Sequence, residues 1–127
     1  LLPVSSLARD RLSRLLQENG GQVTAVTAYE NRPVTEFPPD VLDLFQRNAM
    51  DWVTFFSSSA AVNFYQVLEK YPHIQARYAV ASIGPSTTET LRSLNAVVTV
   101  EAQPHTLEGL LNAILHRIAS PSPPPAK

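Results

Sequence analysis

Three consecutive serines, Ser57 to Ser59, follow an apolar run that extends from Trp52 to Phe56. Apolar residues then recur at a different spacing from Ala60 onward, so the serines lie where a buried strand leads into a helix. The first turn of a helix has unpaired backbone N–H groups and a partial positive charge. Such a turn binds carboxylates or phosphates without lysine or arginine. The pattern therefore predicts an anion-binding loop.

Two further junctions of this kind have the same small polar chemistry. Ser5 and Ser6 follow a short apolar start, and residues 84–87 (GPST) follow a later apolar run. Serine and threonine are also good helix caps, worth about 1 kcal/mol each. Ser86 with Glu89 fits a capping box, which needs no ligand. Capping explains any one loop, whereas three similar loops on one sheet edge favour a bound anion.

The other reactive side chains form no recognisable constellation. His73, His105 and His116 are scattered, without the i, i+4 spacing of helical metal ligands, so we expect no metal site. No serine has a convincing histidine and aspartate partner, which argues against nucleophilic catalysis. Tyr29 ends a predicted strand, where its hydroxyl could face a cleft or its ring could pack; both interpretations stay open.

The elements that must position these loops alternate between strand and helix. The strands are predicted at residues 1–4, 22–28, 53–56, 78–83 and 97–100. The helices are predicted from a Ser6 cap to Asn19-Gly20-Gly21, from an Asp40 cap onward, and at 60–71, 87–94 and 107–119. Short connections between alternating elements predict parallel strands in an open α/β sheet. Its strands VTFF and YAVASI are continuously apolar, as in sheets covered by helices on both faces.

Composition limits the class of protein. The 127 residues are enough for one ordinary domain, and 44% apolar with 17% charged residues is typical of a soluble globular protein. A net charge of −1 offers no overall basic field for nucleic acid or an anionic membrane. The absence of cysteine excludes disulfides and thiol chemistry. No apolar run approaches the roughly 18 residues of a membrane span and no signal peptide is evident, so we expect a cytoplasmic protein.

Two proline-bearing stretches interrupt the alternation. Residues 31–39 (NRPVTEFPP) are typical of a linker between packed units. Residues 120–127 (SPSPPPAK) are too rich in proline and too poor in apolar residues to pack, so we expect a disordered tail.

Several blocks in order resemble uroporphyrinogen-III synthases: LPVS, GGQVTAVTAYENRPV, DWVTFFSSSAAVNF, VASIGPSTTETL and PHTLEGLLNAI. Their order and spacing are similar to the carboxyl-terminal half of that enzyme and cover nearly all of the chain before residue 120. The resemblance implies two α/β domains that face one another across a cleft. Residues 1–30 would be the last strand-helix-strand of one domain, 31–39 the inter-domain linker, and 40–119 an incomplete, flavodoxin-like sheet of the other.

The same resemblance implies an activity. The family cyclises the linear tetrapyrrole hydroxymethylbilane to uroporphyrinogen III in haem biosynthesis and inverts the last pyrrole ring, without a cofactor. Water is lost, a spiro intermediate forms and the ring recloses. The substrate is a flexible polycarboxylate whose cyclisation depends mainly on being held bent. A reaction of this kind needs few catalytic side chains, which agrees with the small number of catalytic motifs in the sequence. The resemblance therefore implies that the serine loops bind the carboxylates of the substrate.

Site residues carry over by position. Tyr29 matches a tyrosine at the domain junction that is a candidate to assist the departure of water. The expected substrate-binding residues are Ser5, Ser6, Ser57, Ser58, Ser59, Ala60, Gly84, Ser86 and Thr87. The match is loose at Ser5 and Ser6, and Ser58 occupies a variable site.

The chain departs from the family in length, because full-length members are much longer. We therefore expect a fragment with weak activity or none. The strand Val53–Phe56 would lack its usual neighbour, and an exposed apolar strand edge is a template for another chain. It should either self-associate or take up the strand Gln22–Ala28.

Two other interpretations use the same fold. One is a non-enzymatic, flavodoxin-like or receiver-like module that binds a protein partner. A receiver would have clustered acidic residues after its first strand and a lysine after a later one, and neither is present at the strand ends. The other is a binding domain for a small anionic ligand such as a sugar phosphate, which would use the same loops.

Overall fold

The computed structural model describes residues 1–5, 10–74 and 77–120. The chain divides into two compact units, Leu1–Pro33 and Val34–Lys127. The boundary between the units falls inside the predicted linker, residues 31–39. Assignment of the units to two domains of a longer protein stays a prediction.

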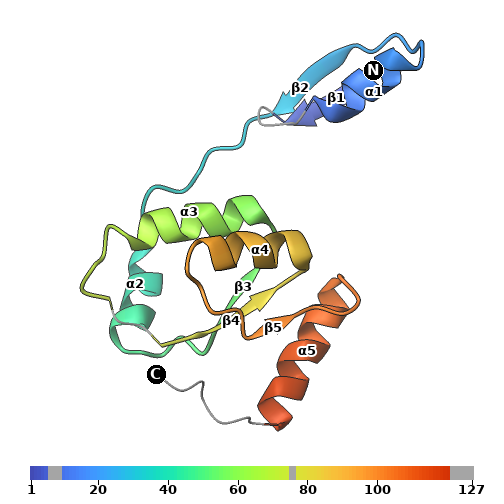
Figure 1. Ribbon diagram of the computed structural model, residues 1–127. Helices are drawn as coiled ribbons and strands as arrows, with labels where there is room; N and C mark the ends of the chain where they lie inside the picture. The colour runs from blue at the N-terminus through green and yellow to red at the C-terminus, as the bar shows by residue number, and fades with distance from the viewer. Residues whose placement is uncertain (6–9, 75–76, 121–127) are drawn as a thin grey trace. The chain divides into compact units, whose positions relative to one another are not determined.

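The first unit is a strand-helix-strand (Figure 1). It consists of β1 (Leu2–Ser5), α1 (Arg11–Glu18) and β2 (Ala25–Tyr29). The two strands pair in parallel, as predicted, and the register places Ser5 opposite Tyr29. The helix ends at Glu18 with Asn19 as its C-cap, followed by Gly20 with a φ of +82°, a conformation that glycine adopts without strain. Its N-cap is Asp10 and not the predicted Ser6, which lies outside the described residues.

The second unit contains a three-stranded parallel sheet in the order β3-β4-β5. Its elements are α2 (Pro39–Gln46), β3 (Trp52–Phe55), α3 (Ser58–Leu68), β4 (Ala79–Ser82), α4 (Pro85–Ser93), β5 (Val100–Glu101) and α5 (Leu107–Ala119). The predicted open α/β sheet is therefore confirmed. Parallel order also brings the carboxyl ends of the three strands to the same edge of the sheet.

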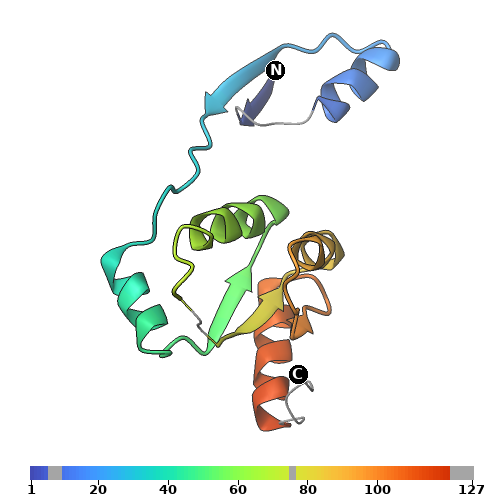
Figure 2. The same cartoon turned by 60° about the vertical axis from the view of Figure 1, so that its left-hand side comes forward.

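Helices cover both faces of this sheet, with α3 and α4 on one face and α5 on the other (Figures 1 and 2). Phe55, Val80 and Leu91 form a buried cluster with Ala61 on the first face. The second face is built by Ala81, Ala102 and Leu110. Since consecutive residues of β4 point to opposite faces, its apolar run supplies both clusters.

A third cluster joins α2 to α3. Phe45 is 2% exposed and packs with Val67 and with Phe37, whose ring centroid lies 5.4 Å from that of Phe45. Phe37 and Thr35 both belong to the predicted linker. Lys70 Nζ donates a hydrogen bond of 2.6 Å to the Thr35 carbonyl. The second half of the predicted linker thus packs as part of the second unit.

Two further predicted helix caps, both in the second unit, are wrong. Pro38, not Asp40, is the N-cap of α2, and Gly84, not Ser86, is the N-cap of α4. Each helix begins earlier than expected because proline is favoured at the first helical position, where its missing N–H is not needed. The capping box of Ser86 with Glu89 is therefore absent.

Other boundaries shift by a few residues. Ser57 caps α3, so this helix begins before Ala60, and it ends at Leu68 rather than at Tyr71. The last strand lies at Val100–Glu101 instead of residues 97–100. The helix over residues 107–119 is confirmed at both ends. No helix within the described part of the chain is long and apolar enough to cross a membrane.

β3 lies at one end of the sheet order, with β4 as its neighbour among the described strands. The predicted transfer of residues 22–28 to this edge is not found, because β2 pairs with β1 instead. The predicted tail, residues 120–127, lies outside the described residues except for Ser120.

Candidate functional site

The β3–α3 loop is built around Ser57. Its extended backbone begins α3, and its Oγ accepts a hydrogen bond of 3.2 Å from the N–H of Ala60. Ser59 Oγ lies 3.2 Å from the same hydroxyl. The predicted binding group at Ala60 is thus already used by the cap. The N–H groups of Ser58 and Ser59 remain without an intrahelical acceptor, because the first turn of a helix offers none.

The β4–α4 loop is held by Ser82 at the end of β4. Ser82 Oγ donates to the Gly84 carbonyl at 3.0 Å and accepts from the Gly84 N–H at 3.3 Å. Pro85 has no N–H, so the first-turn donors of α4 are the backbone N–H groups of Ser86 and Thr87. Thr87 as a whole is buried, with 4% of its surface exposed. Among the predicted binding residues of this loop, Ser86 is the exposed one.

Ser58 connects the two loops. Its hydroxyl donates to the Ser86 carbonyl at 3.1 Å and lies 3.4 Å from Ser86 Oγ. These residues are 28 positions apart in the sequence, and the parallel pairing of β3 with β4 brings them together. The bridge fixes the first turns of α3 and α4 side by side.

This arrangement places two helix N-termini at one edge of the sheet. Each N-terminus is equivalent to a positive charge of roughly one half. Ser57, Ser59 and Ser86 are exposed, so the edge faces solvent. Four backbone N–H groups and the neighbouring hydroxyls are donors that suit a carboxylate or a phosphate.

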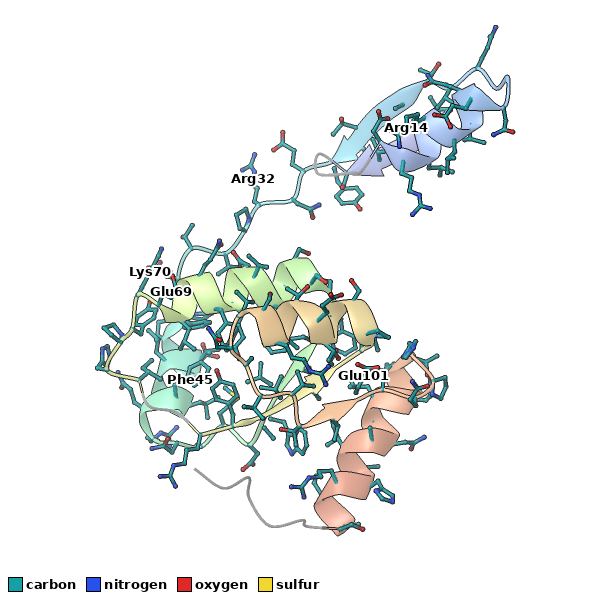
Figure 3. The ribbon with its side chains drawn as sticks, viewed as in Figure 1. Arg14, Arg32, Phe45, Glu69, Lys70 and Glu101 are labelled. Atoms are coloured by element: carbon teal, nitrogen blue, oxygen red, sulfur yellow. The ribbon has the colours of Figure 1, made fainter. Side chains whose placement is uncertain are left out.

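A polar network that the sequence analysis did not anticipate supports the second loop. Ser82 Oγ lies 2.9 Å from Thr88 Oγ1, and Thr88 Oγ1 donates to the carboxylate of Glu101. Glu101 is labelled on β5 in Figure 3. Ser82 and Thr88 are buried. A signal was available, because serine at the end of an apolar strand requires partners once it is buried.

The β5–α5 loop reaches the same region. Thr106 caps α5 by accepting from the Gly109 N–H at 3.1 Å. His105 Nδ1 lies 2.7 Å from the Ala102 carbonyl. The His105 ring lies against Gly84, since a Cβ added there would be 3.2 Å from His105 Cγ. The third loop therefore contacts the second.

The remaining predicted residues belong to the first unit. Ser5 and Tyr29 are cross-strand neighbours at the carboxyl ends of β1 and β2, and Tyr29 is 61% exposed. Ser6 lies outside the described residues.

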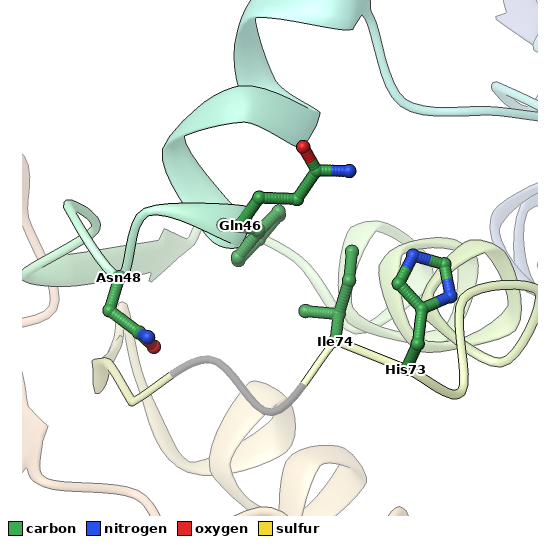
Figure 4. A pocket seen from close by; sticks show the side chains of 5 residues that line it. Gln46, Asn48, His73 and Ile74 are labelled. Carbon is green, nitrogen blue, oxygen red and sulfur yellow. The ribbon is translucent and has the colours of Figure 1, made fainter.

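Two hollows lie away from the serine loops. One of about 240 Å³ is lined by Phe45, Gln46, Asn48, His73 and Ile74 (Figure 4). Asn48 and His73 precede β3 and β4, which places this hollow toward the amino ends of the strands. Another, of about 540 Å³, follows β5 and α5 and includes Gln103, His116 and Arg117. Neither is lined by residues of the serine loops, 57–60 and 84–87.

Comparison with known proteins identifies the family. A family model described as uroporphyrinogen-III synthase HemD matches residues 1–112. The chain is 35% identical over 116 residues to a uroporphyrinogen-III synthase of Synechococcus elongatus, covering 87% of this chain and 44% of that protein. It is 28% identical over 96 residues to the enzyme of Chlorobaculum parvum, covering 75% of this chain and 39% of that one. The chain thus spans less than half the length of these curated relatives. Because the family model covers both units, the chain belongs to the uroporphyrinogen-III synthase family.

Proposed function

We propose that this chain supplies the carboxylate-binding edge of a uroporphyrinogen-III synthase, which cyclises hydroxymethylbilane to uroporphyrinogen III with inversion of the last ring. The Ser58–Ser86 bridge is the observation that carries the proposal. It aligns two helix N-termini whose donors match the carboxylates of a linear tetrapyrrole. The reaction in this proposal is that of the uroporphyrinogen-III synthase family, to which the chain belongs.

The proposed mechanism relies on positioning. Binding several carboxylates along the substrate brings its ends together, so that ring closure becomes an effectively unimolecular step. The hydroxyl of the hydroxymethyl group leaves as water, and the substituted carbon of the last ring bonds to the methylene carbon left behind, which gives a spiro intermediate. The bond from that ring to its original bridge then breaks and re-forms at the other α-carbon of the ring, which loses a proton, so that the macrocycle closes with the ring inverted. Tyr29 is the proposed acid that assists the departure of water; it is 61% exposed, and its backbone pairs with that of Ser5 on the neighbouring strand. No cofactor is required by this scheme.

Titration with uroporphyrin, a stable polycarboxylate analogue, tests the proposal. The amide signals of residues 57–60 and 84–88 should shift in NMR spectra, because these backbone groups bind the carboxylates. A polycationic porphyrin of similar size should leave them unchanged. Shifts confined to the neighbourhood of His116, or no shifts at all, would defeat the carboxylate-edge proposal.

A matched pair of charge variants strengthens this test. Ser59→Glu places a carboxylate in the first turn of α3 and should weaken binding about tenfold or more by repulsion and competition. Gln66→Glu adds the same charge to an exposed position near the other end of α3 and should bind as before.

In an enzyme restored to full length, Tyr29→Phe should slow ring closure without abolishing it. An unchanged rate would return Tyr29 to a structural role.

The same titration separates the alternative function. A binding module for a small anion would respond to inorganic phosphate as strongly as to uroporphyrin, and the restored enzyme would not close the ring. The cytoplasmic location predicted from the sequence stays a prediction.

We further propose self-association through the free edge of β3. β4 occupies one side of β3, and the backbone groups on the other side have no strand partner among the described residues. A second copy of the chain can pair there.

A further inference from the structure

Glu101 is joined to the β4–α4 loop by a chain of side chains. The register of the sheet pairs Glu101 on β5 with Ser82 on β4, and paired residues of neighbouring strands direct their side chains to the same face. Thr88 of α4 contacts both, because its Oγ1 donates to the Glu101 carboxylate and lies 2.9 Å from Ser82 Oγ. Ser82 Oγ in turn contacts the N–H and the carbonyl of Gly84, the N-cap of α4. The carboxylate is thus connected through two hydroxyls to the start of the helix.

Most of this chain of contacts is shielded from water. Ser82 is 0% exposed and Thr88 is 4% exposed, while Glu101 is partly buried. A hydroxyl that loses its partner in such surroundings costs free energy. The two buried hydroxyls therefore favour one position of the first turn of α4 relative to β4 and β5.

The apolar packing of α4 is less directional. Leu91, in the second half of the helix, is fully buried and packs with Phe55 and Val80. Apolar burial has no preferred direction, so it holds the helix on the sheet without specifying where the first turn lies. The place of that turn matters for the site, because the Ser58 hydroxyl bonds the Ser86 carbonyl there.

We propose that Glu101 is a positioning residue of the carboxylate-binding edge; this inference rests on the function proposed above. It acts through Thr88 and Ser82 rather than on the substrate, and it holds the first-turn N–H groups of α4 beside those of α3. A carboxylate near this edge repels the carboxylates of the substrate. Its hydrogen bond to Thr88 gives a reason for an acidic residue at a place where the charge alone is unfavourable.

Two substitutions remove the same carboxylate and differ in the contact that remains. Glu101→Gln keeps an oxygen that can accept from Thr88, whereas Glu101→Val suits a strand but leaves that hydroxyl without its acceptor. Loss of the charge alone would strengthen uroporphyrin binding equally in both variants. We expect Glu101→Gln to bind at least as tightly as the parent chain. Glu101→Val should bind about 2- to 30-fold more weakly than Glu101→Gln, the range for residues that act on a site through others.

Matched variants on α4 control this comparison. Glu89 is exposed on the same helix, so Glu89→Gln and Glu89→Val should bind uroporphyrin equally well. Thr88→Val breaks the chain of contacts at its middle, and in that background Glu101→Gln and Glu101→Val should also bind equally. A difference that persists there would overturn the proposal, as would equal binding by the two Glu101 variants when Thr88 is present.

Urea unfolding identifies the variants that fold. If Glu101→Val unfolds early, Thr88→Ser and Thr88→Val decide the question, because only the serine keeps a hydroxyl between Glu101 and Ser82. Thr88→Ser should then bind as the parent chain does and Thr88→Val more weakly. Equal binding by these two variants would overturn the role of Glu101.

NMR spectra without ligand separate this inference from the proposed function. Glu101→Val should shift the amide signals of residues 84–88 and also that of Ser58 on the neighbouring helix, whereas Glu101→Gln should leave Ser58 nearly unchanged. Uroporphyrin binding by the parent chain together with an unshifted Ser58 in Glu101→Val would overturn the role of Glu101 alone. A shifted Ser58 in a chain that does not bind uroporphyrin would overturn the function and leave Glu101 as a positioning residue of the two loops.

Discussion

Ser57, Ser58 and Ser59 are chemically identical and have different roles. Ser57 caps α3, Ser59 contacts the capping hydroxyl, and Ser58 crosses to Ser86 on the next helix. Each role follows from position in the first turn, where successive side chains point in different directions. Ser86, the partner of Ser58, lies at a position that the sequence pattern predicts as the N-cap of α4, whereas the N-cap in the structure is Gly84.

Tyr65 and Tyr78 provide a prediction at this scale. Burial raises the pKa of Tyr78 well above its ordinary value, and the neighbouring Tyr65 adds to the rise. Burial also raises the pKa of Tyr65, against a lowering by its hydrogen bond with Tyr78. Unfolded tyrosines lose their protons near pH 10, so above about pH 10 the unfolded chain binds fewer protons than the folded one. Stability should be retained below that pH and fall as pH rises above it.

Urea unfolding of the parent chain and Tyr78→Phe, at about pH 8 and about pH 11, checks this linkage. Tyr78→Phe should be less stable at the lower pH, because it loses the hydrogen bond to Tyr65. It should also lose less stability than the parent chain on going to the higher pH. Tyr29→Phe, at an exposed position, is the control. An identical pH dependence of parent and Tyr78→Phe would contradict the prediction.

At the scale of elements, the starts of the helices position the site. α3 and α5 begin with side-chain caps from Ser57 and Thr106, whereas α2 and α4 begin with proline at the first turn. The first kind uses a side chain to satisfy an N–H group, and the second removes an N–H group altogether. In both cases the remaining first-turn N–H groups of α3 and α4 have no acceptor within their own helix.

Gly109 gives a prediction for α5. A Cβ at this position would lie 1.9 Å from the Pro104 carbonyl oxygen, and backbone cannot move aside as a flexible side chain can. Alanine would otherwise favour a helix by about 1 kcal/mol over glycine. We expect Gly109→Ala instead to destabilise the chain by roughly 1–3 kcal/mol, the range for overpacking. Asn112→Ala, at an exposed position of the same helix, should stay within about 0.5 kcal/mol in urea unfolding. A Gly109→Ala variant that is more stable than the parent chain would contradict the prediction and show that the backbone at Pro104 can move away from the added Cβ.

At the scale of the whole molecule, the two units differ in their interiors. The second unit has three buried clusters on its sheet and helices. In the first unit, α1 has no buried residue among those described, and Leu12, Leu15 and Leu16 are each more than 40% exposed. The apolar side chains of α1 are therefore left partly exposed by the described residues of the first unit.

The free edge of β3 carries the prediction for the whole molecule. The carbonyl of Asp51 accepts a hydrogen bond from the N–H of Ala79, and the carbonyl of Phe55 accepts one from the N–H of Ile83. These two residues of β3 therefore direct their carbonyls toward β4. Because backbone groups alternate in direction along a strand, the N–H and C=O of Thr54 face the free edge. Sedimentation at increasing concentration should therefore show self-association.

Substitution at Thr54 locates the contact. Thr54→Pro removes an edge donor without removing a bond to β4, and it should reduce self-association. Thr54→Val keeps that donor and should associate at least as strongly as the parent chain. A parent chain that stays monomeric at high concentration, or a Thr54→Pro variant that associates equally well, would rule out this edge.

Local pattern was enough to predict the class of fold, the helix at residues 107–119 and the serine loop as a strand-to-helix junction. These features depend on periodicity, capping and turn chemistry, which involve residues within a few positions of one another. The beginnings of α2 and α4 were misjudged because cap residues and prolines compete locally, and the sequence pattern does not rank them.

The contacts that make a site of these loops depend on packing between distant segments. Ser58 meets Ser86, the Glu101 carboxylate meets Thr88, and His105 meets Gly84 only once β3, β4 and β5 pair in register. A shift of one residue in a strand turns its side chains to the opposite face, so register decides which groups meet. The register between strands is established only in the assembled sheet, so the contacts between individual residues of these loops could not be predicted from any one segment.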